Sequence, residues 1–243
     1  MADRFFVDRP ITTAVATLAG AEAHHLIHVL RAKPGLIVTL FDGGGAEYGA
    51  HVVRIGRSEV ELAIDERREI DRELPVGITL GVSLPKQDRQ RWLVEKAVEL
   101  GVARFVPLAA RRSVAQPSSE AVERMRRTVV EASKQCGRNR LMEIVASQSP
   151  CEFFGNCPAN HGRWLAHPGG LPLAAAYRQA AQSPASEIAL AIGPEGGFTD
   201  DEVAGATQCG WQTVDLGSRI LRIETAAFDL VAIAGLLAAG ELR

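Results

Sequence analysis

A glycine-rich segment near the C-terminus has the composition of a ligand-binding turn. Residues 193–197 read Gly-Pro-Glu-Gly-Gly and follow an apolar stretch, residues 188–192, that is typical of a buried strand. Thr199 and Glu202 have the spacing of a capping box, so we expect a helix to begin directly after the turn. In open α/β sheets, ligands bind at the carboxyl ends of strands, and glycines there let the backbone approach a ligand closely. Glu195 would project into or beside that crevice; the alternative is an ordinary strand-to-helix turn whose glycines serve geometry only.

A second candidate segment, residues 216–226, places charges in an otherwise apolar stretch. It reads Leu-Gly-Ser-Arg-Ile-Leu-Arg-Ile-Glu-Thr-Ala, and its charged members are Arg219, Arg222 and Glu224. Burying a charge is costly unless it is paired, so this cluster indicates an ion-pair network or a functional site. The helix expected next, residues 225–239, is almost entirely apolar, which predicts burial in the core or against a second subunit.

Other common chemistries find little support. The sequence has no GxGxxG fingerprint, phosphate-binding P-loop or GxSxG nucleophile elbow. The four cysteines lack metal-binding or disulfide spacing. His24 and His28 lie four residues apart without an evident third ligand, so we expect no metal site.

Two regions of different periodicity are expected to position the candidate segments. The first reads as a short helix at residues 22–30 followed by strands at 36–41, 46–55 and 59–64, which indicates a small β-rich unit. A charged stretch, residues 65–75, reads as a linker. We therefore predict one domain at residues 1–70 and a second at 75–243.

The second region alternates apolar strands with helices, which predicts an α/β fold with a parallel sheet covered on both faces. Its expected strands are residues 76–84, 104–108, 164–166, 188–192 and 213–216. A helix is expected at residues 87–100. Another, at residues 119–136, carries one continuous apolar stripe.

Composition and charge restrict the function classes. The chain of 243 residues is 47% hydrophobic and 23% charged, close to the soluble globular average. No apolar run approaches the roughly 20 residues of a membrane helix, and the N-terminus lacks the apolar centre of a secretory signal. We therefore expect a cytoplasmic protein. Residues 111–140 hold eight basic and three acidic side chains, which is typical of either a solvated helix surface or a nucleic-acid contact.

In their order along the chain, these segments resemble the bacterial small-subunit ribosomal RNA (uracil-N3)-methyltransferases, a branch of the SPOUT superfamily. Residues 193–197 and 216–226 carry the most specific part of the resemblance. The other matching segments are residues 4–7, 25–31, 41–43, 96–101 and 131–138. The resemblance implies an N-terminal PUA-like RNA-binding barrel, a C-terminal SPOUT domain with a trefoil knot, S-adenosylmethionine as cofactor, a homodimer, and 16S rRNA of the small ribosomal subunit as substrate.

The resemblance also implies roles for individual residues. The cofactor would be held by Leu165, His167, Gly193, Pro194, Glu195, Gly196, Gly197, Leu216, Gly217, Leu221 and Arg222. RNA would be bound by Arg4, Arg31, Lys33, Arg112, Lys134, Gln135 and Arg138. Methylation of uracil N3 requires loss of its proton, for which Glu195 and Glu224 are candidate bases and Arg222 would stabilise the anion; Arg219 would form a structural pair.

Two other functions are compatible with the same residues. One is a non-catalytic rRNA-binding assembly factor that has kept the fold. The other is a knotted enzyme that methylates a ribose 2′-hydroxyl.

Overall fold

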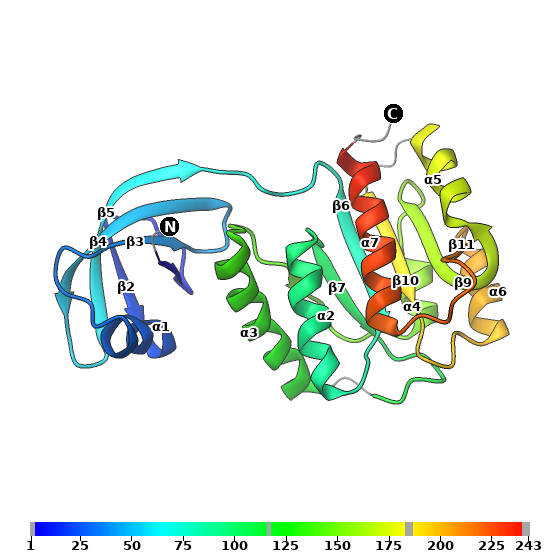
Figure 1. Ribbon diagram of the computed structural model, residues 1–243, viewed down its shortest axis with the longest axis horizontal. Helices are drawn as coiled ribbons and strands as arrows, with labels where there is room; N and C mark the ends of the chain where they lie inside the picture. Colours follow the sequence, from blue (N-terminus) through cyan, green and yellow to red (C-terminus); the bar gives the residue numbers. More distant parts are fainter. Residues whose placement is uncertain (1–2, 116–117, 183–186, 240–243) are drawn as a thin grey trace. The chain divides into compact units, whose positions relative to one another are not determined.

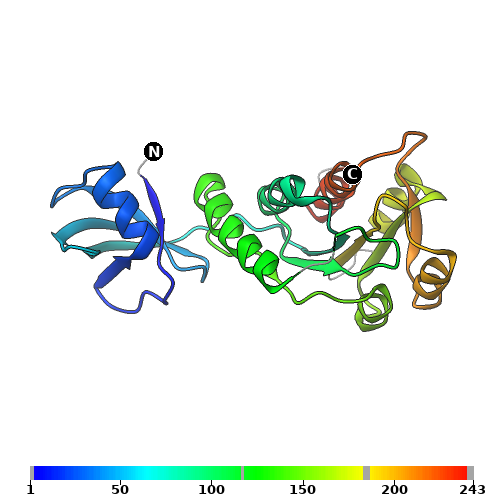
Figure 2. The ribbon, with the colours of Figure 1, turned by 90° about the horizontal axis from the view of Figure 1, so that it is seen from below.

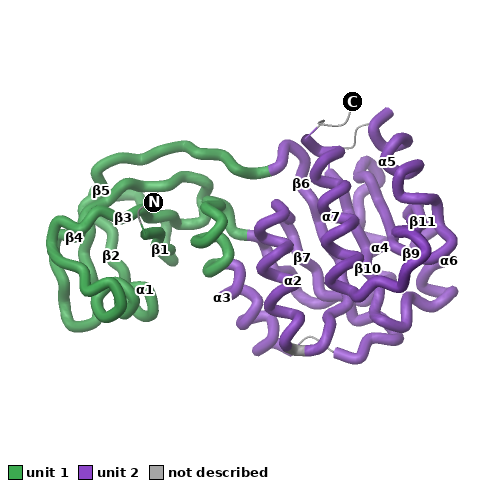
Figure 3. The backbone as a smooth tube through the Cα atoms, viewed as in Figure 1, with its two compact units in different colours: residues 1–73, 130–141 green, residues 74–129, 142–243 purple. Residues whose placement is uncertain are grey.

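The computed structural model describes residues 3–115, 118–182 and 187–239, which fall into two compact units (Figure 3). Unit 1 comprises Met1–Glu73 and Val130–Leu141, and unit 2 comprises Leu74–Val129 and Met142–Arg243. Unit 1 is therefore built from two separate stretches of sequence. Within the described ranges, no helix has the length and hydropathy needed to cross a membrane.

Unit 1 is a five-stranded mixed sheet around a small apolar core. Its strands are β1 (Arg4–Phe6), β2 (Val15–Ala19), β3 (Ile37–Phe41), β4 (Ala46–Ile55) and β5 (Glu59–Glu69), in the order β1-β3-β4-β5-β2. β1 runs parallel to β3, and the other pairs are antiparallel. A short helix α1 (Gly20–His24) continues as a π-helical turn η1 (His25–Val29). Its Leu26 is fully buried against this sheet, with Leu18, Leu40 and Leu62.

The linker predicted from residue 65 was wrong for residues 65–69, which continue β5. Their charges lie on a sheet surface where cross-strand partners compensate them: Arg68 faces Glu47 of β4 in the register. Arg68 also pairs with Glu66 at 3.0 Å. A run of alternating charges can therefore form a strand when its neighbours supply opposite charges.

Unit 2 contains a six-stranded, entirely parallel sheet (Figure 1). Its strands are β6 (Gly77–Ser83), β7 (Arg104–Leu108), β8 (Glu143–Ile144), β9 (Gly162–Pro172), β10 (Glu187–Ile192) and β11 (Gln212–Asp215), in the order β11-β9-β10-β6-β7-β8. The α/β class and the parallel sheet are confirmed.

Helices cover both faces of this sheet. They are α2 (Gln87–Glu99), α3 (Ser119–Cys136), α4 (Pro150–Asn156), α5 (Leu173–Gln182), α6 (Asp200–Gln208) and α7 (Ile223–Ala239). Figure 2 shows α2 and α7 on one face and α4 and α6 on the other. Helix α3 has the predicted bounds, and Met125, Val129 and Ala132 of its apolar stripe are buried.

Helix α4 was not predicted from the sequence. Ser149 and Glu152 form a capping box, and Pro150 occupies the first turn, so a local signal was present. Phe153 and Phe154 of α4 pack in a core cluster with Trp211, which secures this short helix.

Candidate active site

The predicted cofactor loops leave neighbouring strands at one edge of the sheet. β9 lies between β10 and β11, and all three run parallel, so the segments that follow their carboxyl ends meet at the same edge. β9 continues to Pro172, but its ladder with β11 is interrupted between Leu165 and Leu171. Residues 166–170 therefore bulge out of β9, and we call this bulge the first loop. Residues 193–199 form the second loop and residues 215–222 the third.

A single carboxylate ties the first loop to the third. Asp215 accepts a hydrogen bond from the Gly169 amide at 2.9 Å and another from the Gly217 amide at 2.8 Å. These two amides, together with the nearby imidazole of His167, hold the pKa of Asp215 below its ordinary value. Sequence reasoning missed this residue, although Asp-Leu-Gly is the pattern of an Asx turn.

Glycine is required at both amides that bind Asp215. Gly169 and Gly217 have φ angles of 77° and 106°, which disfavour any residue with a Cβ atom. Among the described residues, no atom lies within 4 Å of the position a Cβ would take at either glycine. The loops thus present bare backbone to open space.

The second loop is fixed by the predicted capping box. The Thr199 hydroxyl accepts from the Glu202 amide at 3.3 Å, and Glu202 Oε2 accepts from the Thr199 amide at 2.7 Å. Gly197 has a φ of 69°, and a Cβ at Gly193 would lie 3.0 Å from the Phe198 ring. Glu195 is exposed at the tip of this turn.

Glu224 is the buried charge of the third segment. It stands in the first turn of α7 and is 2% exposed. Its Oε1 accepts from Arg89 Nη1 of α2 at 3.3 Å, whereas its Oε2 is buried with no hydrogen-bond partner in the described part of the chain. Arg89 was not predicted from the sequence, because nothing local connects it to a residue 135 positions away.

The two arginines of the same segment have a different environment. Arg219 and Arg222 are both exposed, and neither forms an ion pair with the residues described. The structural pair predicted for Arg219 is therefore not seen among the described residues. The partner of Glu224 is Arg89. Arg222 keeps its charge at the surface of the third loop.

The apolar members of the predicted cradle lie at different depths. Leu165 is fully buried in the core cluster with Phe154 and Ala191, so it belongs to the core on which the loops rest and not to their surface. Pro194 is buried, whereas His167, Leu216 and Leu221 are half-buried.

Three of the predicted RNA-binding cations are already paired inside unit 1. Arg4 donates to Glu47 at 2.9 Å, Lys134 to Glu22 at 2.8 Å, and Arg138 to Glu73 at 2.8 Å. All three side chains are at most 13% exposed. These contacts give each cation a structural partner within the unit.

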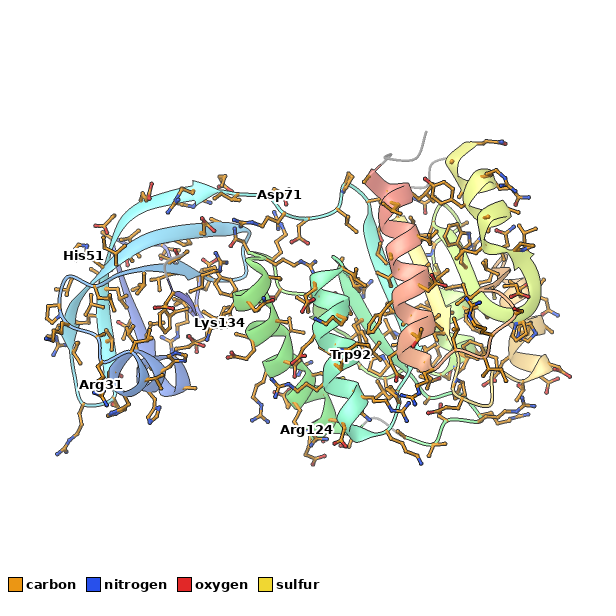
Figure 4. The ribbon with its side chains drawn as sticks, viewed as in Figure 1. Arg31, His51, Asp71, Trp92, Arg124 and Lys134 are labelled. Carbon is orange, nitrogen blue, oxygen red and sulfur yellow. The ribbon has the colours of Figure 1, made fainter. Side chains whose placement is uncertain are left out.

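The remaining predicted RNA residues are exposed. They are Arg31, Lys33, Arg112 and Gln135. Figure 4 labels Arg31 on unit 1 and shows Lys134 on α3. Arg31 lies two residues after the end of η1 and has a φ of 50°, which is unusual for a residue with a side chain. No group of three or more metal-binding side chains occurs among the described residues.

This fold and site are those of an RNA methyltransferase. The family model of the RNA methyltransferase domain matches residues 72–235, and that of the RNA methyltransferase PUA domain matches residues 18–65. Ribosomal RNA small subunit methyltransferase E of Synechocystis is 35% identical over 218 residues, 89% of this chain and 71% of the relative. Ribosomal RNA small subunit methyltransferase E of Bacillus subtilis is 29% identical, and the match covers 86% of this chain and 85% of the relative. The chain therefore belongs to the ribosomal RNA small subunit methyltransferase E family.

Solved structures agree with this assignment. Ribosomal RNA small subunit methyltransferase E of Neisseria gonorrhoeae, bound to S-adenosylmethionine, is 30% identical and superposes with a TM-score of 0.86 over 97% of both chains. A methyltransferase of Legionella pneumophila with bound S-adenosylmethionine is 29% identical, with a TM-score of 0.87 over 99% of this chain and 98% of its own. The predicted pairing of a PUA-like unit with a SPOUT-type α/β domain is confirmed; the trefoil knot stays a prediction.

Proposed function

We propose that this protein transfers a methyl group from S-adenosylmethionine to N3 of a uridine in 16S rRNA of the small ribosomal subunit. The observation that carries the proposal is the buried Glu224 oxygen without a partner, directly after the third glycine loop. A buried carboxylate oxygen left without a donor is costly, and a bound substrate with an N–H group would relieve that cost.

The loops fit a sulfonium nucleoside. Among the described residues, no atom lies within 4 Å of the Cβ position of Gly169, Gly197 or Gly217, so an adenosyl group can approach the backbone closely at these three glycines. Such a ligand carries no phosphate, so the lack of a P-loop lysine is expected. The solved relatives from Neisseria and Legionella were determined with this cofactor. When bound, S-adenosylmethionine supplies a methyl group on a positively charged sulfur.

The chain's own residues orient the base and take its proton. Asp215 holds the first and third loops in one arrangement, which favours in-line approach of the reacting atoms. We assign Glu224 Oε2 as the acceptor of the N3 proton, with Oε1 held by Arg89. Arg222 stabilises the negative charge left on the uracil ring. Glu195 is the rival base, but it is exposed to solvent. The target uridine must be unstacked to reach these groups.

Exposed basic and amide side chains supply the RNA contact in this proposal. Four of the predicted side chains can bind phosphate or sugar without losing a protein partner: Arg31, Lys33, Arg112 and Gln135. The other three would have to give up a carboxylate partner within the protein; they are Arg4, Lys134 and Arg138. We assign residues 1–70 to the RNA-binding domain and 75–243 to the methyltransferase domain, in the cytoplasm where ribosomal subunits are made.

We further propose a homodimer formed through α2 and α7. Trp92 of α2, labelled in Figure 4, is 45% exposed, and Leu236 of α7 is 36% exposed. The Trp92 ring packs edge-to-face against the ring of Phe228 of α7, with 4.8 Å between the ring centroids. An apolar helix that buries only one face supports a partner on the other. The C-terminal helix was expected either in the core or against a second subunit, and its exposed residues favour the second.

The test combines purified protein with small subunits from a strain that lacks the gene. Nucleoside mass spectrometry should detect new 3-methyluridine that depends on S-adenosylmethionine, and calorimetry should detect S-adenosylhomocysteine binding. RNA binding without methyl incorporation would instead identify an assembly factor. Methylation that makes a phosphodiester resistant to alkali would identify a ribose 2′-O-methyltransferase.

A further inference from the structure

Arg112 lies against the glycine turn of the second loop. It follows β7, and its guanidinium Nη1 donates to the Gly196 carbonyl at 2.8 Å across 84 positions of sequence. A Cβ at Gly196 would lie 3.3 Å from Arg112 Cδ and 3.5 Å from its Cβ. The aliphatic part of Arg112 therefore covers Gly196, and the guanidinium fixes its carbonyl.

The neighbouring residue fastens the same two segments through the backbone. The Arg111 amide donates to Glu202 Oε1 at 2.9 Å, while the other oxygen of Glu202 caps α6. The Arg111 side chain is 72% exposed and, among the residues that the structure describes, pairs with Asp201 at 3.6 Å. Arg111 and Arg112 thus carry equal charge, but only the Arg112 side chain contacts the glycine turn.

The segment that carries these arginines is itself anchored. Ala110 is buried, and the Ser113 amide donates to the Ala110 carbonyl at 3.0 Å. The Ser113 hydroxyl lies 3.4 Å from that of Ser83, which is fully buried at the end of β6. These contacts fix the backbone on both sides of Arg112, next to its hydrogen bond with Gly196.

Arg112 has hydrogen-bonding capacity to spare. A guanidinium carries five N–H donors, and the described residues engage one of them, through the Gly196 carbonyl. The side chain is exposed. A guanidinium fork matches a phosphate group in geometry and charge, so the other donors can bind an RNA phosphate while the Gly196 contact persists.

We propose that Arg112 couples RNA binding to cofactor binding, by holding an RNA phosphate and the Gly196 carbonyl with one guanidinium. This inference rests on the proposed function. A side chain already held by a phosphate has lost its rotamer freedom, so its bond to Gly196 forms without that entropic cost. RNA thereby stabilises the cofactor-binding shape of residues 193–197. Linkage requires that the cofactor strengthen RNA binding by the same factor.

The experiment measures the affinity for S-adenosylhomocysteine by equilibrium dialysis, with and without saturating unmodified small subunits. For the wild-type chain we expect affinity about tenfold higher with subunits, within the usual range of coupling. Arg112→Ala should reduce this ratio to about one. Arg111→Ala is the matched control, because it removes the same charge from the adjacent position, and its ratio should stay near the wild-type value.

The outcomes separate this inference from the proposed function. An unchanged ratio in Arg112→Ala, or an equal loss in Arg111→Ala, would overturn the coupling role. Arg112→Lys keeps the charge but not the fork, so it should also lose most of the coupling; full coupling in this variant would show that charge alone suffices. If the wild-type chain binds S-adenosylhomocysteine and subunits independently, only the coupling fails. If it binds no S-adenosylhomocysteine, the proposed function itself fails.

Discussion

Arg89 of α2 donates to one carboxylate oxygen of Glu224 of α7 at 3.3 Å and leaves the other oxygen buried without a partner among the described residues. Arg89 is 36% exposed at the side chain and Glu224 only 3%. The arginine side chain is therefore in contact with solvent, whereas the carboxylate is shielded from it. A carboxylate held at one oxygen and without a hydrogen-bond donor at the other is a candidate proton acceptor of fixed orientation.

Glu224→Gln removes the proposed base and keeps the side-chain shape. We expect methyl transfer to slow by about 10²- to 10⁴-fold, the usual worth of a general base. The affinity for S-adenosylhomocysteine should change little. Single-turnover kinetics with labelled cofactor measures the rate, and Glu195→Gln is the control for the rival base. Loss of activity in Glu195→Gln with normal rates in Glu224→Gln would assign the proton transfer to Glu195.

Arg89→Ala should destabilise the fold and lower activity together, because it leaves a buried carboxylate unpaired. We expect a loss of about 1–2 kcal/mol in unfolding free energy, less than for a fully buried pair since Arg89 is partly exposed. Urea unfolding measures this loss. Arg91→Ala, two positions further along α2, removes a surface pair with Glu95 and should cost at most about 0.5 kcal/mol. In the Glu224→Gln background, Arg89→Ala should cost less than alone; full additivity would mean that the two side chains act independently.

Asp215→Ala should release the first loop from the third. Two backbone amides then lose their acceptor, and we expect S-adenosylhomocysteine to bind at least about tenfold more weakly, as for loss of two hydrogen bonds of about 1 kcal/mol each. Calorimetry measures the affinity. Asp200→Ala, an exposed carboxylate of α6, serves as the control and should bind normally. Normal binding by Asp215→Ala would show that the loops hold their shape without this carboxylate.

Acid should weaken unit 1 through Glu47. Burial raises the pKa of this carboxyl, but hydrogen bonds and charge from Arg4 and Arg72 outweigh it, so the pKa lies below its ordinary value of 4.5. A lowered pKa in the folded state means that the stabilisation is complete above pH 4.5 and declines as the pH falls through the folded-state value.

Glu47→Gln tests this dependence. At pH 7 the variant should be less stable by about 2–4 kcal/mol, because it leaves the nearly buried Arg4 without its anion. The difference between wild type and variant should shrink as the pH is lowered below 4.5, as followed by urea unfolding. Glu61→Gln is the exposed comparison: its hydrogen bond with Arg54 also lowers the pKa of Glu61, so we expect the same trend but much weaker, because solvent screens an exposed pair. A constant difference from pH 7 to 3 would contradict the proposed role of the ionised carboxylate.

The sequence by itself determined the elements whose signals are local. The apolar stripe of α3, the strand at Arg104–Leu108 and the capping box of Thr199 and Glu202 were all predicted at their observed positions. Each depends on residues a few positions apart, and the periodicity of burial is visible in such short windows. The two glycine segments were identified in the same way.

Only the tertiary structure decided which polar groups meet. Arg138 and Glu73 are separated by 65 positions in the sequence. The separation is 46 positions for Gly169 and Asp215, and it is 135 positions for Arg89 and Glu224. The arginines of residues 111–140 were all candidates for RNA contact by sequence. In the structure some of them are buried in ion pairs, such as Arg138, and others are exposed, such as Arg112. Charge type can be read from a sequence, but pairing depends on distance in space, and the order of strands in the sheet sets that distance.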